Sequence, residues 1–300
     1  MQTENVNTIE KAAANPGKLR DYAAFMKFRL ASLVVFSAAI AYTAMPGAVD
    51  WAKMGWLVLG GFLVTGASNG FNQILEKDLD KLMNRTQNRP LPQERMSINE
   101  AFILAALAGI VGIAILWIFM NPLSGVLGLL ALLLYTVVYT PLKRVTPFAV
   151  FVGAFPGAIP PLLGCVAATG GFGEIPLLGW IMFAGQFMWQ FPHFWAIAWV
   201  LDDDYRKAGF RMLPSAGGRD KSSAYQVLIY ALFLYPISLM PVMFHFTHGL
   251  VAPLVISFCS IYFLYQAYVL YKECTVEAAR KLMFGSFFYL PAIQLAVLYG

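Results

Sequence analysis

Residues 55–92 read GWLVLGGFLVTGASNGFNQILEKDLDKLMNRTQNRPLP, and this stretch decides the fold class. Its first part, residues 55–75, is an apolar run long enough for a helix to cross the ~30 Å hydrocarbon core of a bilayer. The run passes directly into charged residues, so polar side chains stand where a membrane segment meets water. The stretch therefore predicts a membrane helix with a functional site at its polar end.

The composition extends this prediction to the whole chain. Of its 300 residues, 59% are hydrophobic and 12% are charged, and that charged share is about half the share typical of soluble domains. Apolar runs of membrane-spanning length occur at 30–46, 55–75, 99–119, 122–140, 148–169, 177–201, 223–245, 251–271 and 281–299. We predict an all-α polytopic membrane protein in which nine transmembrane helices form a bundle around a central cavity open to the cytoplasmic side. Residues 1–28 are expected to form a cytoplasmic N-terminal arm without a cleavable signal peptide, and residues 29–300 to form the transmembrane domain.

The basic residues predict the topology. Of the 21 Lys and Arg residues, all but Lys53 lie before residue 30 or in alternate connections between the apolar runs, with Lys281 counted at the edge of the last run. By the positive-inside rule, the N-terminus is cytoplasmic and the C-terminus is external, in the cytoplasmic (inner) membrane of the cell. The external connections are nearly free of charge, so any chemistry is expected to face the cytoplasm. The expected surroundings are the lipid bilayer, with no nucleic-acid partner.

A first acidic motif follows the run that ends at residue 75. Asn72, Glu76 and Asp80 are four residues apart, and each such step turns a helix by only about 40°, so their side chains share one helix face. Carboxylate and amide oxygens are suitable ligands for Mg²⁺. Arg85 and Arg89 follow, and arginine binds phosphate groups through paired hydrogen bonds. The interpretation is a site for a magnesium–diphosphate substrate; the alternative is a set of solvated charges that mark the cytoplasmic side.

Residues 193–204 hold a second polar group. Asp202, Asp203 and Asp204 are adjacent, and three neighbouring carboxylates need a cation or a metal in order to stay ionised together. On a helix, His193 would lie about 14–17 Å deeper in the membrane, where an ionisable side chain is a functional candidate. The alternatives are a solvated start of a loop for the aspartates and a hydrogen bond within the bundle for the histidine.

Tyr135 and Tyr139 lie one helical turn apart near the end of the fourth apolar run. They are predicted either to form part of an aromatic belt at the membrane interface or to face a reacting centre, where their rings would stabilise an allylic cation.

Both acidic motifs resemble those of a known family. The pattern N-x3-[DE]-x3-D of Asn72, Glu76 and Asp80 resembles the first acidic motif of the UbiA superfamily of intramembrane prenyltransferases. The string DDDYRKAGFRMLP at 202–214 resembles the second motif as the haem O-forming members carry it, and FPHFW around His193 is similar to their histidine-containing segment. Glu76 stands where the superfamily usually has Asp, and Ala208 stands where many members have a further Asp; the second departure fits the haem O-forming members better than the quinone-forming ones.

The resemblance implies a reaction. A farnesyl group would pass from farnesyl diphosphate to a vinyl group of protohaem IX, giving haem O and diphosphate. Magnesium would be the divalent cation, haem would be a substrate and not a cofactor, and the downstream haem A synthase would be a partner. Two alternatives stay open: a prenyltransferase of this superfamily that acts on a quinone precursor or another aromatic acceptor, and a membrane transporter or lipid-binding protein.

The same resemblance assigns residues to roles. The implied catalytic residues are Asn72, Glu76, Asp80, Arg85, Lys143 and Asp204. The implied metal ligands are Asn72, Glu76, Asp80, Asp203 and Asp204. The implied diphosphate ligands are Lys27 and Arg29 in MKFRL, Arg85, Arg89, and Lys143 and Arg144 in YTPLKR. His193 is the implied contact to haem.

Overall fold

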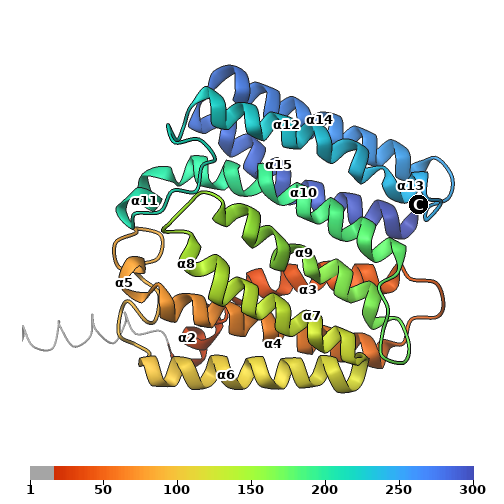
Figure 1. Cartoon of the computed structure of the whole chain (residues 1–300), viewed down its shortest axis with the longest axis horizontal. Helices are drawn as coiled ribbons and strands as arrows, with labels where there is room; N and C mark the ends of the chain where they lie inside the picture. Colours follow the sequence, from red (N-terminus) through yellow and green to blue (C-terminus); the bar gives the residue numbers. More distant parts are fainter. Residues whose placement is uncertain (1–16) are drawn as a thin grey trace, which may run out of the picture.

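The computed structural model describes residues 17–300, and every regular element in that part of the chain is helical (Figure 1). The predicted all-α class is thus confirmed for the described residues. The predicted N-terminal arm lies outside them up to residue 16. The elements are α2 (Lys18–Phe25), α3 (Phe28–Thr43), α4 (Trp51–Leu75), α5 (Lys77–Asp80), α6 (Ile98–Ile115), the π-helical η1 (Leu116–Met120), α7 (Pro122–Leu133), the π-helical η2 (Leu134–Tyr139), α8 (Thr140–Leu142), α9 (Ala149–Ala167), α10 (Leu177–Val200), α11 (Asp202–Lys207), α12 (Lys221–Ser238), α13 (Met240–Met243), α14 (Val251–Glu273) and α15 (Val276–Tyr299).

The chain is a multi-pass membrane protein. Among the described residues, six continuous helical stretches are long and apolar enough to cross a bilayer, and a seventh is added if α2 and α3, which bend by 48° at their junction, form one span. The stretch Ile98–Met120 has only 33% of its most apolar part buried inside the protein, so most of its apolar surface faces lipid. Helices α4 and α10, with 25 and 24 residues, are as long as these spans but are not among them. The count of nine crossings therefore stays a prediction.

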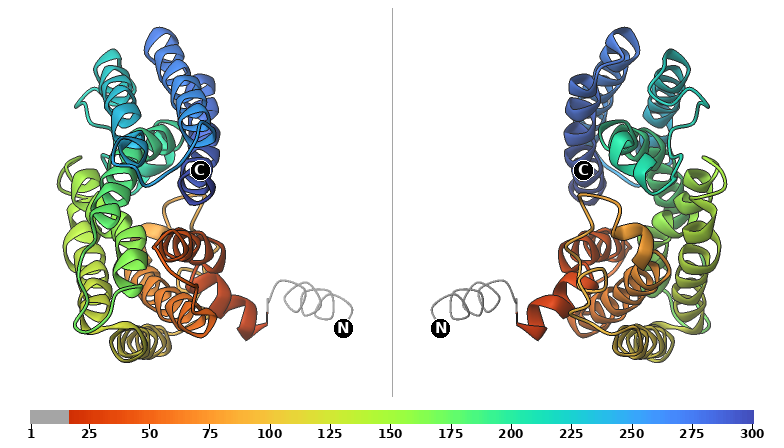
Figure 2. Two further views of the ribbon diagram at one scale, coloured as in Figure 1. Left: turned by 90° about the vertical axis from the view of Figure 1, so that its right-hand side faces the viewer. Right: turned by 90° about the vertical axis from the view of Figure 1, so that its left-hand side faces the viewer.

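The long helices pack into two groups that share α10 (Figures 1 and 2). Helix α4 packs against α3 and α6, and α9 packs against α3, α7 and α10. On the other side of α10, helices α12 and α15 pack against α10, and α14 packs against both α12 and α15. One apolar core lies among α10, α12, α14 and α15, and a second lies among α4, η1, α7 and α9.

The short helices α5, α8 and α11 lie together at one end of the bundle, opposite α13 and the C-terminus (Figure 1). We call it the α5–α11 end. It carries both acidic motifs, which are separated by more than a hundred residues in the sequence.

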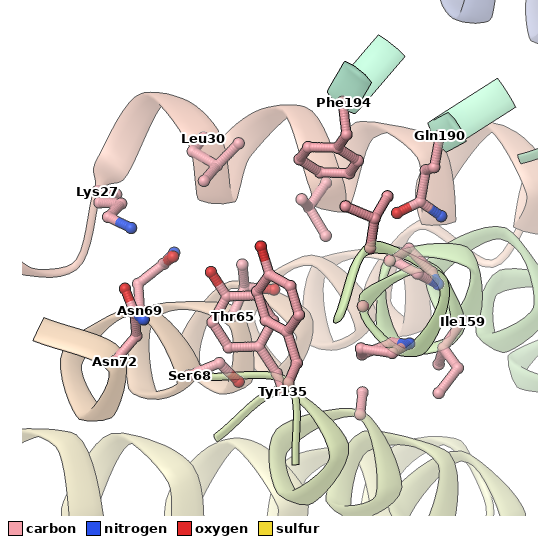
Figure 3. A pocket seen from close by; sticks show the side chains of 18 of the residues that line it. Lys27, Leu30, Thr65, Ser68, Asn69, Asn72, Tyr135, Ile159, Gln190 and Phe194 are labelled. Carbon is pink, nitrogen blue, oxygen red and sulfur yellow. The ribbon is translucent and has the colours of Figure 1, made fainter. Parts of the chain in front are cut away.

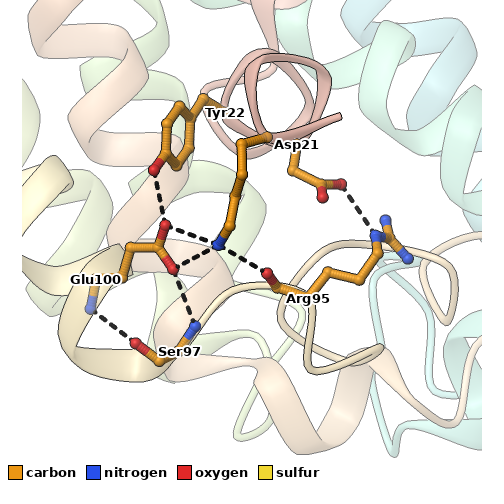
Figure 4. A network of polar contacts seen from close by, with 6 residues as sticks. Asp21, Tyr22, Arg95, Ser97 and Glu100 are labelled. Atoms are coloured by element: carbon orange, nitrogen blue, oxygen red, sulfur yellow. Dashed lines mark hydrogen bonds and ion pairs between the residues drawn. The ribbon is translucent and has the colours of Figure 1, made fainter. Parts of the chain in front are cut away.

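Helix α2 is fastened to the start of α6 at this end (Figure 4). Ser97 caps α6 and forms a capping box with Glu100. The Glu100 carboxylate also accepts hydrogen bonds from Tyr22, at 2.7 Å, and from Lys18, at 3.0 Å. Arg95 pairs with the buried Asp21 at 3.0 Å. These contacts fix α2 relative to the loop that follows the first acidic motif.

The bend between α2 and α3 is held by α4. Lys27 has a φ of 50°, in the left-handed region that bulky residues rarely adopt. The Gln73 side chain donates a hydrogen bond to the Phe25 carbonyl oxygen just before the bend. Gly70 leaves room for the Phe25 ring, since a Cβ there would lie 2.7 Å from it. The bend therefore has a fixed position on α4, and it fixes the position of Lys27.

Candidate active site

A cavity of about 460 Å³ lies between α3, α4, the stretch from α7 to Lys143, α9 and α10, within the size range of small-molecule sites. Its polar wall, at the α5–α11 end, is formed by Lys27, Asn69, Asn72, Glu76, Arg85, Arg89, Tyr135, Tyr139, Lys143 and Tyr205. Figure 3 shows Lys27 above Asn69 and Asn72 at this end, with Ile159 at the far end. The remaining wall is mostly apolar. The cavity thus suits a ligand with a charged head and a long apolar tail.

The first acidic motif is divided by a break in its helix. We predicted that Asn72, Glu76 and Asp80 lie on one face of one helix, but α4 ends at Leu75 and Asp80 belongs to the separate α5. The backbone of Glu76, with φ −101° and ψ 8°, departs from helical values. The four-residue hydrogen bonds nevertheless continue, from Glu76 N to Asn72 O at 3.0 Å and from Asp80 N to Glu76 O at 2.7 Å. The predicted spacing of the three side chains is therefore kept through the break.

Each carboxylate of this motif meets a base that lines the cavity. Glu76 forms an ion pair with Lys143, and both side chains are at least nine-tenths buried. Asp80 is fully buried behind the cavity wall, where Arg89 Nη1 lies 2.7 Å from its Oδ2. The other oxygen of Asp80, Oδ1, is buried without a hydrogen-bond partner. Burial raises the pKa of Asp80 above the usual carboxylate value, although Arg89 opposes the rise.

Lys143 lies between the first motif and the aromatic wall. Its Nζ is 5.0 Å from the centre of the Tyr139 ring and 5.5 Å from that of Phe210. Burial lowers the pKa of Lys143, and the charge of Glu76 opposes this effect. Asn72, which donates a hydrogen bond to Thr140 Oγ1 at 3.3 Å, ties α4 to the same segment.

The second acidic motif holds the loop of the first. Asp204 Oδ1 accepts a hydrogen bond from the Asn84 amide at 2.8 Å, and Oδ2 accepts one from the Arg85 amide at 3.2 Å. Burial alone would raise the pKa of Asp204, but these two amide bonds, together with Lys207, lower it below the usual value. Asp204 is not part of the cavity wall. The next residue, Tyr205, is part of it, and Arg85 lies over the Tyr205 ring at 5.1 Å.

The other two aspartates each have a cation of their own. Asp202 is buried and pairs with Arg206 at 2.8 Å. The Asp203 side chain is 82% exposed and pairs with Arg219 at 2.9 Å. The expectation that the triple aspartate needs cations is thus met by three basic side chains of α11 and the following loop.

The predicted diphosphate ligands fall into two sets. Lys27, Arg85, Arg89 and Lys143 line the cavity. Arg29 and Arg144 are exposed and lie outside the cavity wall. Their assignment to the diphosphate stays a prediction.

His193 lines the cavity on α10 and is buried against α15. Its Nδ1 lies 2.6 Å from Ser286 Oγ, and its ring stacks on Trp189 at 4.2 Å. Ser286 Oγ also lies 2.5 Å from the Met283 carbonyl oxygen, and when its proton is donated there, Nδ1 of His193 is the donor in the bond that the two side chains share. This tautomer leaves Nε2 with a free lone pair, which is the form that binds a metal.

Several residues that line the cavity are not among those predicted from the sequence. Tyr205 follows Asp204, and Asn69 lies one helical turn before Asn72. Their positions next to the two acidic motifs could have identified them as candidates. Gln190 lies one turn from His193; its Nε2 donates to the Ala154 carbonyl oxygen at 2.9 Å, and its amide oxygen points into the cavity (Figure 3). Gln190 could have been predicted as a functional candidate because it is a glutamine within an apolar run, and a buried amide needs hydrogen-bond partners.

The donor atoms at the polar end fit a divalent cation. Among residues 17–300, no three His, Cys, Asp or Glu side chains are already arranged to hold a metal. Asn72 and Glu76 nevertheless offer oxygens at the cavity wall, and the lone buried Oδ1 of Asp80 lacks the partner that a buried charged group needs. Hard oxygen donors of this kind are those that Mg²⁺ prefers.

Comparisons with known proteins agree with this geometry. The family model described as the UbiA prenyltransferase family matches residues 32–290. The protein named protoheme IX farnesyltransferase from Cytophaga hutchinsonii is 46% identical over 276 residues, which cover 92% of this chain and 95% of the relative. The protein of the same name from Christiangramia forsetii is 46% identical over 281 residues, which cover 92% of each chain.

Solved structures share the fold. A chain from work on digeranylgeranylglyceryl phosphate synthase has a TM-score of 0.77 at 20% identity and covers 94% of this chain and 98% of its own. A UbiA homologue from Archaeoglobus fulgidus, bound to GPP and Mg²⁺, has a TM-score of 0.67 at 14% identity and covers 92% of this chain and 99% of its own. From the family match and the identity to these relatives, the chain belongs to the UbiA prenyltransferase family.

Proposed function

We propose that this chain transfers a farnesyl group from farnesyl diphosphate to a vinyl group of protohaem IX, giving haem O and diphosphate. The observation that carries the proposal is the cavity with bases and carboxylates at one end and an apolar wall beyond them, which matches a diphosphate joined to a prenyl tail. The acceptor is assigned from the relatives named protoheme IX farnesyltransferase.

The diphosphate binds at the α5–α11 end. Lys27, Arg85, Arg89 and Lys143 surround its oxygens there, and fixed positive charges at a leaving group stabilise the charge that develops on it. Asn72, Glu76 and Asp80 would hold Mg²⁺, which neutralises diphosphate charge and so helps this group to leave. We also predict Asp203 and Asp204 as metal ligands. Their role is supported less well by the structure, because the Asp203 side chain pairs with Arg219 and the Asp204 side chain accepts hydrogen bonds from the loop amides.

The ion pairs at the polar end indicate which groups exchange partners when a substrate binds. Lys143 pairs with Glu76, and Arg89 pairs with Asp80. With a diphosphate in the cavity, the two bases would turn to its oxygens, and the two carboxylates would then be able to hold the cation. The number of charges in the site stays balanced, so neither partner is left as a buried unpaired ion.

Chemistry then proceeds beside the aromatic wall. The bond between C1 of the farnesyl group and the diphosphate oxygen breaks, and its electron pair leaves with the diphosphate. The rings of Tyr135 and Tyr139, which line the cavity next to this position, stabilise the allylic cation. The π electrons of the vinyl group form the new carbon–carbon bond, water adds to the resulting cation beside the porphyrin ring, and a proton is released.

The acceptor lies toward α10 and α15. We assign His193 to haem, as an axial ligand through the lone pair of Nε2 or, with a proton on Nε2, as a hydrogen-bond donor to a propionate group. The apolar wall keeps bulk water away from the allylic cation until the carbon–carbon bond has formed.

In the membrane, nine crossings with a cytoplasmic N-terminus place the α5–α11 end inside the cell, where the positive-inside rule puts most of the basic residues. This orientation in the cytoplasmic membrane, and delivery of haem O to haem A synthase, complete the proposal.

A product assay tests the function. Purified protein in detergent is incubated with Mg²⁺, haem and labelled farnesyl diphosphate, and the products are identified by mass. We expect haem O and one diphosphate for each haem consumed, with no product when 4-hydroxybenzoate replaces haem. Prenylation of 4-hydroxybenzoate but not of haem would overturn the assignment of the acceptor.

A further inference from the structure

The apolar end of the cavity is closed by side chains of one core. The second apolar core among α4, η1, α7 and α9 contributes Val64, Leu116, Ile159 and Leu163 to the cavity wall. All four are more than nine-tenths buried. The cavity therefore ends on a packed core and does not continue to the opposite face at this point.

Leu116 is the central residue of this closure. It is fully buried, and it begins the π-helical segment η1, where the Asn121 amide bonds to the Leu116 carbonyl oxygen at 3.2 Å. Segments of π-helix change the direction of side chains within an α-helix and are frequent at functional sites. The Leu116 side chain fills the space beside two glycines: a Cβ on Gly60 would lie 3.0 Å from it, and one on Gly128 would lie 2.8 Å from it.

The distance from the polar end to this closure can be measured along α4. Asn72, at the polar end, and Gly61, near the closure, both line the cavity and are separated by about 16 Å at the 1.5 Å rise of an α-helix. An extended carbon chain advances ~1.2 Å per bond, so the main chain of a farnesyl group spans about 13 Å and that of a geranylgeranyl group about 18 Å. The farnesyl chain is therefore short enough to lie between the levels of Asn72 and Gly61, whereas the geranylgeranyl chain is too long.

We propose that Leu116 is a specificity-determining residue that sets the length of the prenyl chain, so that the cavity accepts three isoprene units and excludes four. This inference rests on the proposed function, because it assumes that the cavity holds a prenyl diphosphate. It adds the residue that selects among substrates of that class.

The first test lengthens the cavity. Leu116→Ala removes the closing side chain, and Leu57→Ala is the matched control, since Leu57 is fully buried in the same core but does not line the cavity. For each protein, kcat/KM is measured with geranyl, farnesyl and geranylgeranyl diphosphates, with haem as acceptor. We expect Leu116→Ala to raise the preference for geranylgeranyl over farnesyl diphosphate by about 10-fold or more, the discrimination typical of a few methylene groups, and Leu57→Ala to leave it unchanged.

The second test shortens the cavity and does not depend on the stability of the first variant. A Cβ on Gly61 would meet only Val35, at an ordinary contact distance of 3.4 Å, so Gly61→Val places its methyl groups in the cavity without a backbone clash. We expect kcat/KM for farnesyl diphosphate to fall by about 10-fold while that for geranyl diphosphate is kept.

The outcomes separate the two proposals. Unchanged preferences in both variants, with haem products still formed, would overturn the role of Leu116 and leave the proposed function in place. If Leu116→Ala does not fold, Leu116→Val, which removes a single methylene group, is measured in its place with the same three diphosphates. Absence of any prenylated haem from the wild-type protein, with all three diphosphates, would overturn the proposed function itself.

Discussion

The two acidic motifs are alike in sequence but differ in what binds their carboxylates. Glu76 and Asp80 are buried, and their partners Lys143 and Arg89 line the cavity. The aspartates of the second motif pair with bases of α11 and its following loop, and Asp204 binds backbone amides of the first loop. The difference teaches that two similar acidic motifs can have different surroundings: the carboxylates of the first pair with bases that line the cavity, where we propose that the substrate binds, whereas Asp204 of the second holds the loop that follows the first.

The largest expected effect is at Asp80. Replacing Asp80 by Asn removes a fully buried charge at the proposed cation site, and we expect haem O formation to fall by about 10³-fold, as when a preorganised charge is removed from an active site. The measurement is kcat/KM for farnesyl diphosphate. Asp78→Asn is the matched control, because Asp78 is an exposed residue of the same short helix and its removal should leave the rate unchanged. Normal turnover in the Asp80 variant would remove this carboxylate from the mechanism.

A second comparison tests whether Glu76 and Lys143 act as a pair. Glu76→Gln and Lys143→Met are each expected to lower activity by about 10²-fold, because each leaves its partner as a buried unpaired charge. In the double variant the stability loss should be smaller than the sum of the two single losses, as for residues in direct contact. Thermal unfolding of all four proteins measures the coupling. Strict additivity would show that the two charges do not interact.

A smaller effect is expected at Asp204, because it acts through the loop. Asp204→Ala should lower activity by about 10–100-fold, the range for groups that orient a site from behind, while Asp204→Asn keeps one acceptor oxygen and restores part of the loss. Asp203→Ala is the control, since its side chain is 82% exposed. The loss should appear mainly in KM for the diphosphate. A loss at Asp204 as complete as that at Asp80, unrelieved by Asn, would place both carboxylates on the metal.

The smallest expected effect is a change in the shape of the pH profile. Protonation of Asp80 at low pH removes the charge that the site needs, so kcat/KM falls on the acidic side as pH drops through the pKa of Asp80, which burial has raised. Arg89→Ala removes the neighbouring positive charge that opposes this rise, so the pKa rises further and the acidic limb moves to higher pH. The rate of the variant falls at all pH values through lost diphosphate binding. An acidic limb at its wild-type position would mean that Asp80 does not control it.

Much of the fold could be predicted from apolar periodicity. The predicted runs at 177–201 and 251–271 correspond to α10 (Leu177–Val200) and α14 (Val251–Glu273). The start of α4 was placed at 55, whereas the helix begins at Trp51, capped by Asp50, because the charged Lys53 in the first turn resembled a loop residue. Such boundaries depend on capping contacts that hydropathy does not register.

The positions of site residues could be predicted from the sequence where the residues repeat at helical spacing. They could not be predicted where contacts between distant segments determine them. The spacing of Asn72, Glu76 and Asp80 predicted a shared helix face, and two of the three line the cavity, but the break at Glu76 left no trace in the pattern. The position of Asp204 on the Asn84 and Arg85 amides depends on segments about 120 residues apart, which only the folded chain brings together. The π-helical direction of Leu116 has no sequence signature of its own.

The fastening of α2 to α6 has a consequence for biogenesis. Lys18 and Tyr22 bind Glu100, which is 82 and 78 residues further along the chain, so their partner is synthesised well after the first apolar segment, residues 30–46. The N-terminal helix can dock only after the segment that begins at Ile98 has been synthesised. In a nascent chain that ends before residue 100, Lys18 and Tyr22 therefore have no Glu100 to bind, so α2 lacks its attachment to α6 until the third apolar segment has begun.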